Sequence, residues 1–566
     1  MQKLIVNGCC KGGTDMKKWL SCLLAAMLIV ISFAGCGGSA DQMSKDTDSG
    51  VPAGGNEAAS GETTADTENK DVLTGLPETL MDGEVKAAPE MYPNVDFSKA
   101  GTVHLYMIGD TPQDWDRILA EINAYLEPFN TTLETVIISW ADMGTMYSLS
   151  LAGGEEIDLV YTAPWCYMYT EAAKGSFYAM DRSFISQNMP LTDKYQAETS
   201  YAEATVDGKI IAIPSNLEKA DTKIVAIRQD LAEKHGIEKL ENWDDYMNFM
   251  LTMAEKETPE SGILAQASSG NNAELWEVYR QQYDMFYLLK DNNLHYQYQY
   301  KEGEIPSVED IELCWNSEAF LNFAKDMKTL ADAGCWSRGA LSGTVSDDDA
   351  FGALQGASIA WNGTVFNYMR MAEKNEGVKC MAYDLTKDHL VSCEEFNNND
   401  MAIATATKDP YRSAMVLDIL KMDTYVNRLL TLGIENDHYT INGYEYTRGA
   451  NAEAYAPNSV SASWGVNNGI YEENGVEARE KEMVDSWEPR ITSNPTVTFV
   501  FNDKEVTDYA SACKAVMGDY IPSLQLGLVD DVEAYLAEMN AKLEEAGIAK
   551  IEEELFRQYT EWAATR

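Results

Sequence analysis

The feature that most constrains the fold is an alternation of apolar runs and amphipathic stretches that begins near residue 100. Val103–Ile108 is an apolar run typical of a buried strand, and Trp115–Phe129 places its apolar residues on one helical stripe. The runs Leu133–Ile138 and Ile157–Tyr161 repeat the strand pattern after a further helical segment. Strands that alternate with helices in this way predict a parallel sheet with helices on both faces, and therefore an α/β fold.

The pattern continues through the rest of the chain. Val206–Ile210 carries an Asp-Gly pair between apolar alternations, which predicts a β-hairpin. Further strands are expected at Lys223–Arg228, Ala357–Trp361 and Ala402–Ala406. Helices are expected at residues 230–237, 243–255, 320–330, 410–422, 532–543 and 551–562. A chain of this length exceeds what one hydrophobic core usually holds, so two or more lobes are expected.

The amino-terminal region indicates where the protein works. Two lysines precede the apolar run Trp19–Ile31, which is too short to span a bilayer comfortably, and the small pair Ala34-Gly35 leads to Cys36. The segment resembles a bacterial lipoprotein signal, in which Cys36 receives the lipid and becomes the mature amino terminus. A signal anchor and an ordinary secretion signal are the alternatives. Residues 1–15 are expected to be an upstream extension of the reading frame or an unusual leader, and residues 1–35 together are left out of the predicted fold.

Residues 36–97 are expected to form a disordered acidic tether. From Gly37 to about Glu90 the chain is rich in Gly, Ser, Ala, Thr, Asp and Glu and contains no aromatic residue. Such a segment cannot bury enough apolar surface to offset the entropy lost on ordering. We therefore expect a flexible spacer between the lipid and the folded part.

Net charge excludes some partners. The formal net charge is -48, and removal of residues 1–35, which are net positive, makes it more negative. Nucleic acid is a poor partner for such a surface. Acidic lipid headgroups would also repel it, so the membrane is expected to hold the protein through the lipid alone.

Motifs for catalysis or metal binding are missing from the sequence. The five histidines lie far apart with no HExxH pattern, and no GxSxG or Walker loop occurs. The 91 acidic residues make chance carboxylate pairs inevitable, but none stands out as a glycosidase pair. We expect no cofactor, no metal and no enzyme activity. Six cysteines follow Cys36, without a CxxC pair; Cys380 and Cys393 either pair or remain buried thiols, and the others are Cys166, Cys314, Cys335 and Cys513.

Several phrases resemble one known family. They include Gly153–Leu159 before the third strand, Lys174–Asp181, and the stretch Val206–Pro214. In this order and spacing they are similar to the family 1 extracellular solute-binding proteins of ABC transporters. Ala404–Pro410, Gly433–Thr440 and Asp519–Pro522 resemble a lipoprotein subgroup of that family that carries a DUF3502-like domain of unknown function at its C-terminus.

The resemblance implies a two-lobed clamp of the type II periplasmic-binding-protein kind. Each lobe would be a doubly wound sheet flanked by helices, and the C-terminus would be helical. The first lobe would take in residues 98–217 and about 400–460, and the second residues 218–399 and about 461–566. Hinges are expected at Ser215–Lys223 and Asn397–Asp400.

Ligands of doubly wound sheets lie beyond the carboxyl ends of the strands, which selects the candidate site residues. Sugars present apolar C–H faces and many hydroxyls, so their sites need flat aromatic rings and planar hydrogen-bonding groups. After the first three expected strands the candidates are Gly109, Asp110, Trp140, Trp165 and Tyr167. The second lobe and the hinges add Asn216, Trp361, Asn362, Asn399 and Trp464, whereas Trp115 is expected in the core and Trp276, Trp315 and Trp336 are left open.

The sequence therefore predicts a lipid-anchored, monomeric binding protein on the outer face of the cytoplasmic membrane. It would close on a carbohydrate, expected to be an oligosaccharide, and deliver it to ABC permease subunits. An exported carbohydrate-active enzyme, a surface adhesin and a peptide receptor on the same fold are the alternatives.

Overall fold

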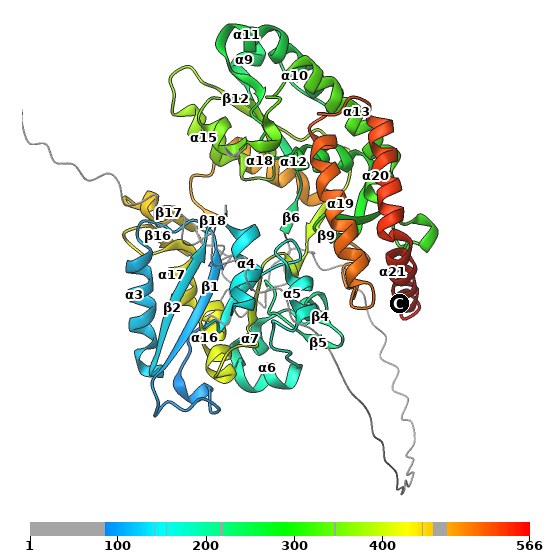
Figure 1. Cartoon of the computed structure of the whole chain (residues 1–566). Helices are drawn as coiled ribbons and strands as arrows, with labels where there is room; N and C mark the ends of the chain where they lie inside the picture. The colour runs from blue at the N-terminus through cyan, green and yellow to red at the C-terminus, as the bar shows by residue number, and fades with distance from the viewer. Residues whose placement is uncertain are drawn as a thin grey trace, which may run out of the picture. The chain divides into compact units, whose positions relative to one another are not determined.

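The computed structural model describes residues 85–566, apart from residues 141, 154–155, 216–218, 344–346, 444 and 457–471 (Figure 1). The described residues all lie in the unit Lys70–Arg566. The lipoprotein signal, Cys36 and most of the expected tether lie outside them. Among the described residues no helix is both long and apolar enough to cross a membrane.

The first sheet has the strand order β15-β3-β1-β2. Its strands are β1 (Gly101–Ile108), β2 (Thr131–Ile138), β3 (Leu159–Thr162) and β15 (Asp400–Ile403). β1 pairs in parallel with both β2 and β3, while β15 runs antiparallel to β3. The apolar run predicted to be a strand is buried, with Leu105 and Met107 fully inaccessible. The sheet confirms the expected parallel order of the first three strands.

Helices surround this sheet in the predicted order. α3 (Trp115–Leu126) follows β1 and packs against β2, and α16 (Pro410–Met422) packs against β1 and β15. Trp115 is buried, as expected for a core residue. The remaining helices of this part are α4 (Met143–Ala152), α5 (Met168–Lys174), α6 (Arg182–Asn188), α7 (Pro190–Tyr195), α8 (Ser200–Glu203) and α17 (Thr424–Leu432).

The Asp-Gly hairpin forms as predicted. β4 (Thr205–Val206) and β5 (Lys209–Ile210) pair antiparallel around a two-residue turn. Asp207 and Gly208 have φ values of 50° and 71°. A tight turn that matches the twist of its strands needs positive φ at both central residues, which Asp-Gly supplies at low cost.

The second sheet has the order β13-β7-β12-β8. Its strands are β7 (Ile224–Arg228), β8 (Leu264–Gln266), β12 (Gly356–Trp361) and β13 (Cys380–Tyr383). β7 runs antiparallel to both neighbours, and β12 runs parallel to β8. The antiparallel strand is thus β15 in the first sheet and β7 in the second, and each comes directly after an expected hinge segment.

A small three-stranded sheet is formed by segments that connect the two main sheets in the sequence. β6 (Lys219–Asp221) pairs antiparallel with β14 (Val391–Glu394), and β14 pairs in parallel with β19 (Ile491–Thr492). β6 comes just before β7, and β14 comes just before β15. β6 lies on the segment that leads from the first sheet to the second, and β14 lies on the segment that leads back. The two segments are therefore paired with each other although they are far apart in the sequence.

The second core is larger and mainly helical. α13 (Glu318–Ala333) and the C-terminal helices α19 (Thr507–Gln525) and α20 (Val532–Ala546) pack against one another. Gly547, in left-handed conformation with φ 94°, ends α20 at the predicted break before α21 (Ile548–Ala563). Other helices are α9 (Gln229–Lys234), α10 (Trp243–Thr252), α11 (Thr258–Ser261), α12 (Ala273–Arg280), α14 (Asp347–Gly352), α15 (Val365–Glu373) and α18 (Ala478–Trp487).

Two further small sheets complete the described strands. One joins β9 (Met285–Asp291), β10 (Leu294–Gln299) and β11 (Glu312–Leu313), and the other joins β16 (Tyr439–Asn442), β17 (Glu445–Arg448) and β18 (Glu472–Glu473). α19 packs against β10, which ties the C-terminal helices to the second core.

The tryptophans and cysteines left open by the sequence are all internal. Trp276, Trp315 and Trp336 are at most 2 % exposed and belong to the second core. The six cysteines after Cys36 are buried free thiols, so Cys380 and Cys393 form no disulfide.

The expected tether ends earlier than predicted. Val85 and Tyr92 are buried in the first core. The Tyr92 hydroxyl donates to Asp418 at 2.9 Å, and the backbone of Val85 exchanges hydrogen bonds of 2.9 Å with the hydroxyl and amide of Thr424. The prediction of disorder up to residue 97 is therefore wrong for residues 85–97. Composition missed these contacts because they depend on partners more than 300 residues away.

Candidate functional site

The first sheet brings several predicted residues to one edge. β1, β2 and β3 are parallel, so the residues that follow them, Asp110, Trp140 and Trp165, lie at their common carboxyl edge. β15 is antiparallel, so Asn399, which comes before it, lies at the same edge. Segments separated by more than 200 residues therefore converge there.

Two exposed tryptophans form the main feature of this edge. The rings of Trp140 and Trp165 lie 6.1 Å apart at an interplanar angle of 33°. Their exposed fractions are 48 % and 40 %, which is high for the most apolar large side chains. The ring of the buried Tyr161 also contacts Trp165, at a centroid distance of 5.8 Å. The arrangement is a row of three aromatic rings, two of which face solvent.

Hydrogen bonds fix Trp165 in this position. Its indole Nε1 donates to the carbonyl of Asn398 at 2.9 Å. The Tyr161 hydroxyl donates to Oδ1 of Asn399 at 2.7 Å. Both bonds join the loop and end of β3 to the segment that enters β15. The aromatic row is thus held by the same residues that were expected to form a hinge.

Other predicted residues of the first sheet have mainly structural contacts. Tyr167 is half-buried, stacks on Tyr147 at 5.6 Å, and has a raised pKa because of burial. Gly109 is buried, with its amide bonded to Ile138 of the neighbouring strand. Asp110 is exposed. Packing accounts for Tyr167 and Gly109, and their contact with a ligand stays a prediction.

The second sheet presents a different edge. Trp361, at the carboxyl end of β12, is 40 % exposed, and the Lys223 ammonium lies 5.2 Å from its ring centroid. Lys223 also pairs with Glu274 at 3.1 Å. Burial raises the pKa of Glu274, although 27 % of its side chain reaches solvent. This edge therefore combines one aromatic ring with an ion pair.

Backbone contacts hold Lys223 in place. Gln281 accepts from the Lys223 amide at 2.7 Å and donates to its carbonyl at 2.8 Å. Asn362 accepts from both the amide and the hydroxyl of Thr364, at 3.1 and 2.9 Å, in a turn before α15. The side-chain oxygen of Asn362 thus stabilises the turn. Asn216 and Trp464 lie outside the described residues.

Sequence reasoning missed Lys223, Glu274 and Tyr161 as neighbours of the candidate site. Tyr161 was assigned only to a buried strand, and nothing in the sequence links Lys223 to Glu274. Two pockets of about 290 Å³ also lie away from the predicted residues. One is lined by Ile157, Gly175 and Ala404 at the opposite end of β3, and the other by Tyr279 and His389 in the second core.

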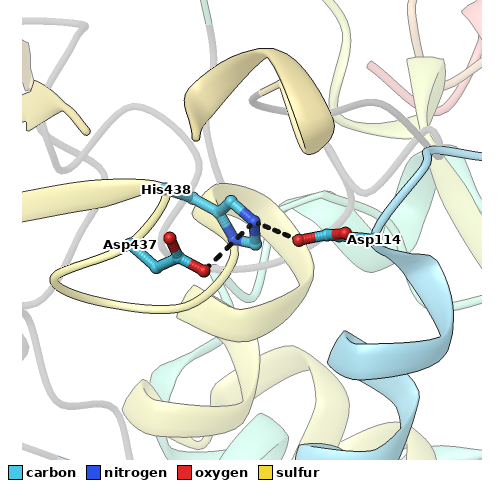
Figure 2. A group of neighbouring side chains, drawn as sticks. All are labelled: Asp114, Asp437 and His438. Atoms are coloured by element: carbon cyan, nitrogen blue, oxygen red, sulfur yellow. Dashed lines mark hydrogen bonds and ion pairs between the residues drawn. The ribbon is translucent and has the colours of Figure 1, made fainter. Parts of the chain in front are cut away.

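One side-chain cluster has the composition of a metal site. Asp114, Asp437 and His438 lie close together at the amino end of α3 (Figure 2). Nδ1 of His438 accepts from the Ile434 amide at 2.9 Å, so Nε2 carries the proton and donates to Asp114 at 3.1 Å. Arg117 binds both carboxylates. Because Arg117 already supplies the positive charge, we interpret the cluster as an ion-pair network that fastens residues 437–438 to α3.

Comparison with known proteins gives the class of the fold. The crystal structure of the N-glycan transport solute-binding protein NgtS from Streptococcus pneumoniae with Man5GlcNAc matches with a TM-score of 0.65 and 18 % identity, over 83 % of this chain and 99 % of that one. The alginate-binding protein AlgQ2 matches with a TM-score of 0.61 and 14 % identity, over 82 % and 98 %. The fold is that of the type II solute-binding proteins, as the resemblance implied.

Sequence comparison adds two findings. Residues 495–564, which include all of α19, α20 and α21, match the domain of unknown function DUF3502. A carbohydrate ABC transporter substrate-binding protein of Streptococcus pneumoniae serotype 4 (strain ATCC BAA-334 / TIGR4) is 23 % identical over 485 residues, covering 81 % of this chain and 90 % of the relative. Both agree with the subgroup resemblance drawn from the sequence phrases.

Proposed function

We propose that this protein captures a carbohydrate outside the cell and delivers it to the permease of an ABC importer. The observation that carries the proposal is the pair of exposed rings, Trp140 and Trp165, at the carboxyl edge of the first sheet of a solute-binding fold. Exposed aromatic faces suit the C–H faces of sugar rings. The carbohydrate-binding names of the relatives support the same substrate class.

The mechanism is a population shift between arrangements of the two sheets. Trp165 lies at the edge of the first sheet and Trp361 at the edge of the second. A saccharide that contacts both edges binds best to the state in which they are close, and that difference in affinity drives closure. The paired segments β6 and β14 accommodate the movement. The protein acts as a monomer without a cofactor, and catalysis has no part in this cycle.

A ligand screen by thermal shift tests the substrate class. The full chain is heated with oligosaccharides, monosaccharides and short peptides, because a ligand that binds only the folded state stabilises it by about 2.7 kcal/mol at a hundred times its Kd. We expect at least one saccharide to raise the Tm. The Trp140→Ala/Trp165→Ala double variant should lose that shift. If a peptide raises the Tm and no saccharide does, the substrate class is wrong.

Membrane attachment through Cys36 completes the proposal. The lipid would hold the receptor on the outer face of the cytoplasmic membrane, close to its permease. Replacing Cys36 by Ala should abolish incorporation of labelled palmitate and release the protein into the medium. Replacing Cys22, inside the apolar run of the signal, by Ala is the matched control and should leave labelling unchanged. Persistent labelling of the Cys36→Ala variant would remove the anchor.

A further inference from the structure

The charges at the two sheet edges bear on which saccharides the proposed site accepts. We define the site rim as the segments that adjoin these edges: residues 109–114, 139–142, 163–167 and 397–399 at the first sheet, and residues 219–223, 267–272, 361–364 and 384–389 at the second. The first four segments contain no lysine or arginine. The other four contain Lys219, Lys223 and Lys387.

The described lysines of the rim are already neutralised. Lys223 pairs with Glu274 at 3.1 Å, and Lys387 pairs with Glu241. The side chain of Lys219 lies outside the described set. Each rim lysine whose side chain is described is therefore matched by a carboxylate.

Some carboxylates of the rim, unlike its described lysines, have no ion-pair partner among the described residues. Asp110 and Asp142 have no ion-pair partner among the described residues, although Asp142 accepts from the Ser139 hydroxyl at 2.8 Å. Both follow strands of the first sheet, as Trp140 does. Both side chains are exposed, and carboxylates without a cationic partner repel an approaching anion, most strongly at low salt. The field at the first edge therefore opposes a negatively charged ligand.

The aromatic rings act in the same direction. The face of a tryptophan ring carries the negative part of its quadrupole, so it attracts C–H groups and cations and disfavours anions. Trp361 shows this preference, because it already has the Lys223 ammonium beside its ring. A sugar that stacks on Trp140 or Trp165 would place its substituents near a face that does not favour a carboxylate.

We infer that the site selects uncharged saccharides and rejects acidic ones such as uronate oligomers. The inference rests on the proposed carbohydrate function and narrows it. Among the proteins of similar fold, one is described as alginate-binding and another was crystallised with Man5GlcNAc, so the fold alone does not decide between these classes. In this chain, the carboxylates and tryptophan rings of the rim favour uncharged saccharides.

Matched pairs of saccharides test the inference on the full chain. β-1,4-Mannotetraose and the β-1,4-mannuronate tetramer differ only in the oxidation of C6, and cellotetraose and its glucuronate counterpart form a second pair. Affinities are measured by calorimetry at low salt. We expect the neutral member of a binding pair to bind at least tenfold more tightly. The ratio should shrink as salt is raised from about 20 mM to about 500 mM, since screening weakens repulsion.

The outcomes separate the two claims. An acidic tetramer that binds as tightly as its neutral partner overturns the charge selection and leaves carbohydrate capture standing. Failure of every neutral and acidic saccharide, in these pairs and in the thermal-shift screen, overturns the carbohydrate function and the selection with it.

A charge variant tests the physical cause. Glu274→Gln leaves the Lys223 ammonium without its carboxylate partner, so it should raise the affinity for the acidic tetramer at least threefold relative to the neutral one. Glu544→Gln, on the exposed face of α20, changes the net charge equally and should not alter the ratio. An unchanged ratio in Glu274→Gln contradicts the inference.

Discussion

The two sheet edges use tryptophan in different ways. At the first edge, Trp165 packs between Trp140 and Tyr161, and its indole is bonded to the backbone of Asn398. At the second edge, Trp361 lies beside the Lys223–Glu274 pair. The first arrangement is a preformed surface of aromatic rings. In the second, a single aromatic ring lies next to the ammonium of Lys223. We therefore expect the first edge to supply most of the binding energy.

The largest expected effect is at the first edge. Trp165→Ala removes the central ring and its bond to Asn398, so we expect the Kd for a saccharide ligand to rise about 30-fold or more, as for a central aromatic anchor worth ~2 kcal/mol. Because the ring is 40 % exposed, the Tm of the free protein should change little. Trp165→Phe keeps an aromatic ring at this position, so it should raise the Kd less than Trp165→Ala does. A large drop in Tm would mark Trp165 as a core residue instead.

A smaller effect is expected at the second edge. Trp361→Ala should raise the Kd about tenfold, because one ring is lost while the ion pair remains. Lys223→Met is the matched variant, since it keeps the packing of the side chain next to the ring and removes the ammonium. Calorimetry with the same saccharide measures both. If Trp361→Ala weakens binding more than Trp165→Ala does, the comparison of the two edges is reversed.

The smallest effect concerns pH and the second edge. Burial raises the pKa of Glu274, so the folded protein takes up this proton at higher pH than the unfolded chain does. The stability linked to this proton is fully present below the ordinary pKa of a glutamic acid and is lost as the pH rises through the raised value.

Glu274→Gln should therefore flatten part of the dependence of Tm on pH at pH values above the ordinary pKa of a glutamic acid, about 4. Trp140→Ala, at the first edge, should leave the profile unchanged. If both variants share the wild-type profile, Glu274 does not distinguish the two edges electrostatically.

Much of the fold could be predicted because it depends on patterns of residues that are close together in the sequence. The alternation around β1, β2 and β3 gave the parallel order, and the Asp207-Gly208 pair gave the hairpin. The carboxyl-edge rule then selected Trp140 and Trp165 without any knowledge of their contacts. Their exposure and the 6.1 Å separation of their rings agree with an accessible surface, but ligand contact by these residues stays a prediction.

The remaining features depend on contacts between distant parts of the chain. Trp165 and Asn398 are 233 residues apart, and Asp114 and His438 are 324 residues apart. No periodicity or motif links such residues, because their proximity is created by the fold. The ordered start at Val85 was missed for the same reason, since its partner, Thr424, belongs to α17 and lies 339 residues further along the chain.

The attachment of Val85 to Thr424 also has a mechanical consequence. The Ala87 amide bonds to Asp423 at 2.8 Å, and the Tyr92 hydroxyl bonds to Asp418, so residues 85–92 are fastened to α16 and α17 at several points. A pull on the amino-terminal end is therefore transmitted to the first core and bypasses β6 and β14. A chain held from that end is held through its first core, at α16 and α17, rather than through the segments that lead to the second sheet.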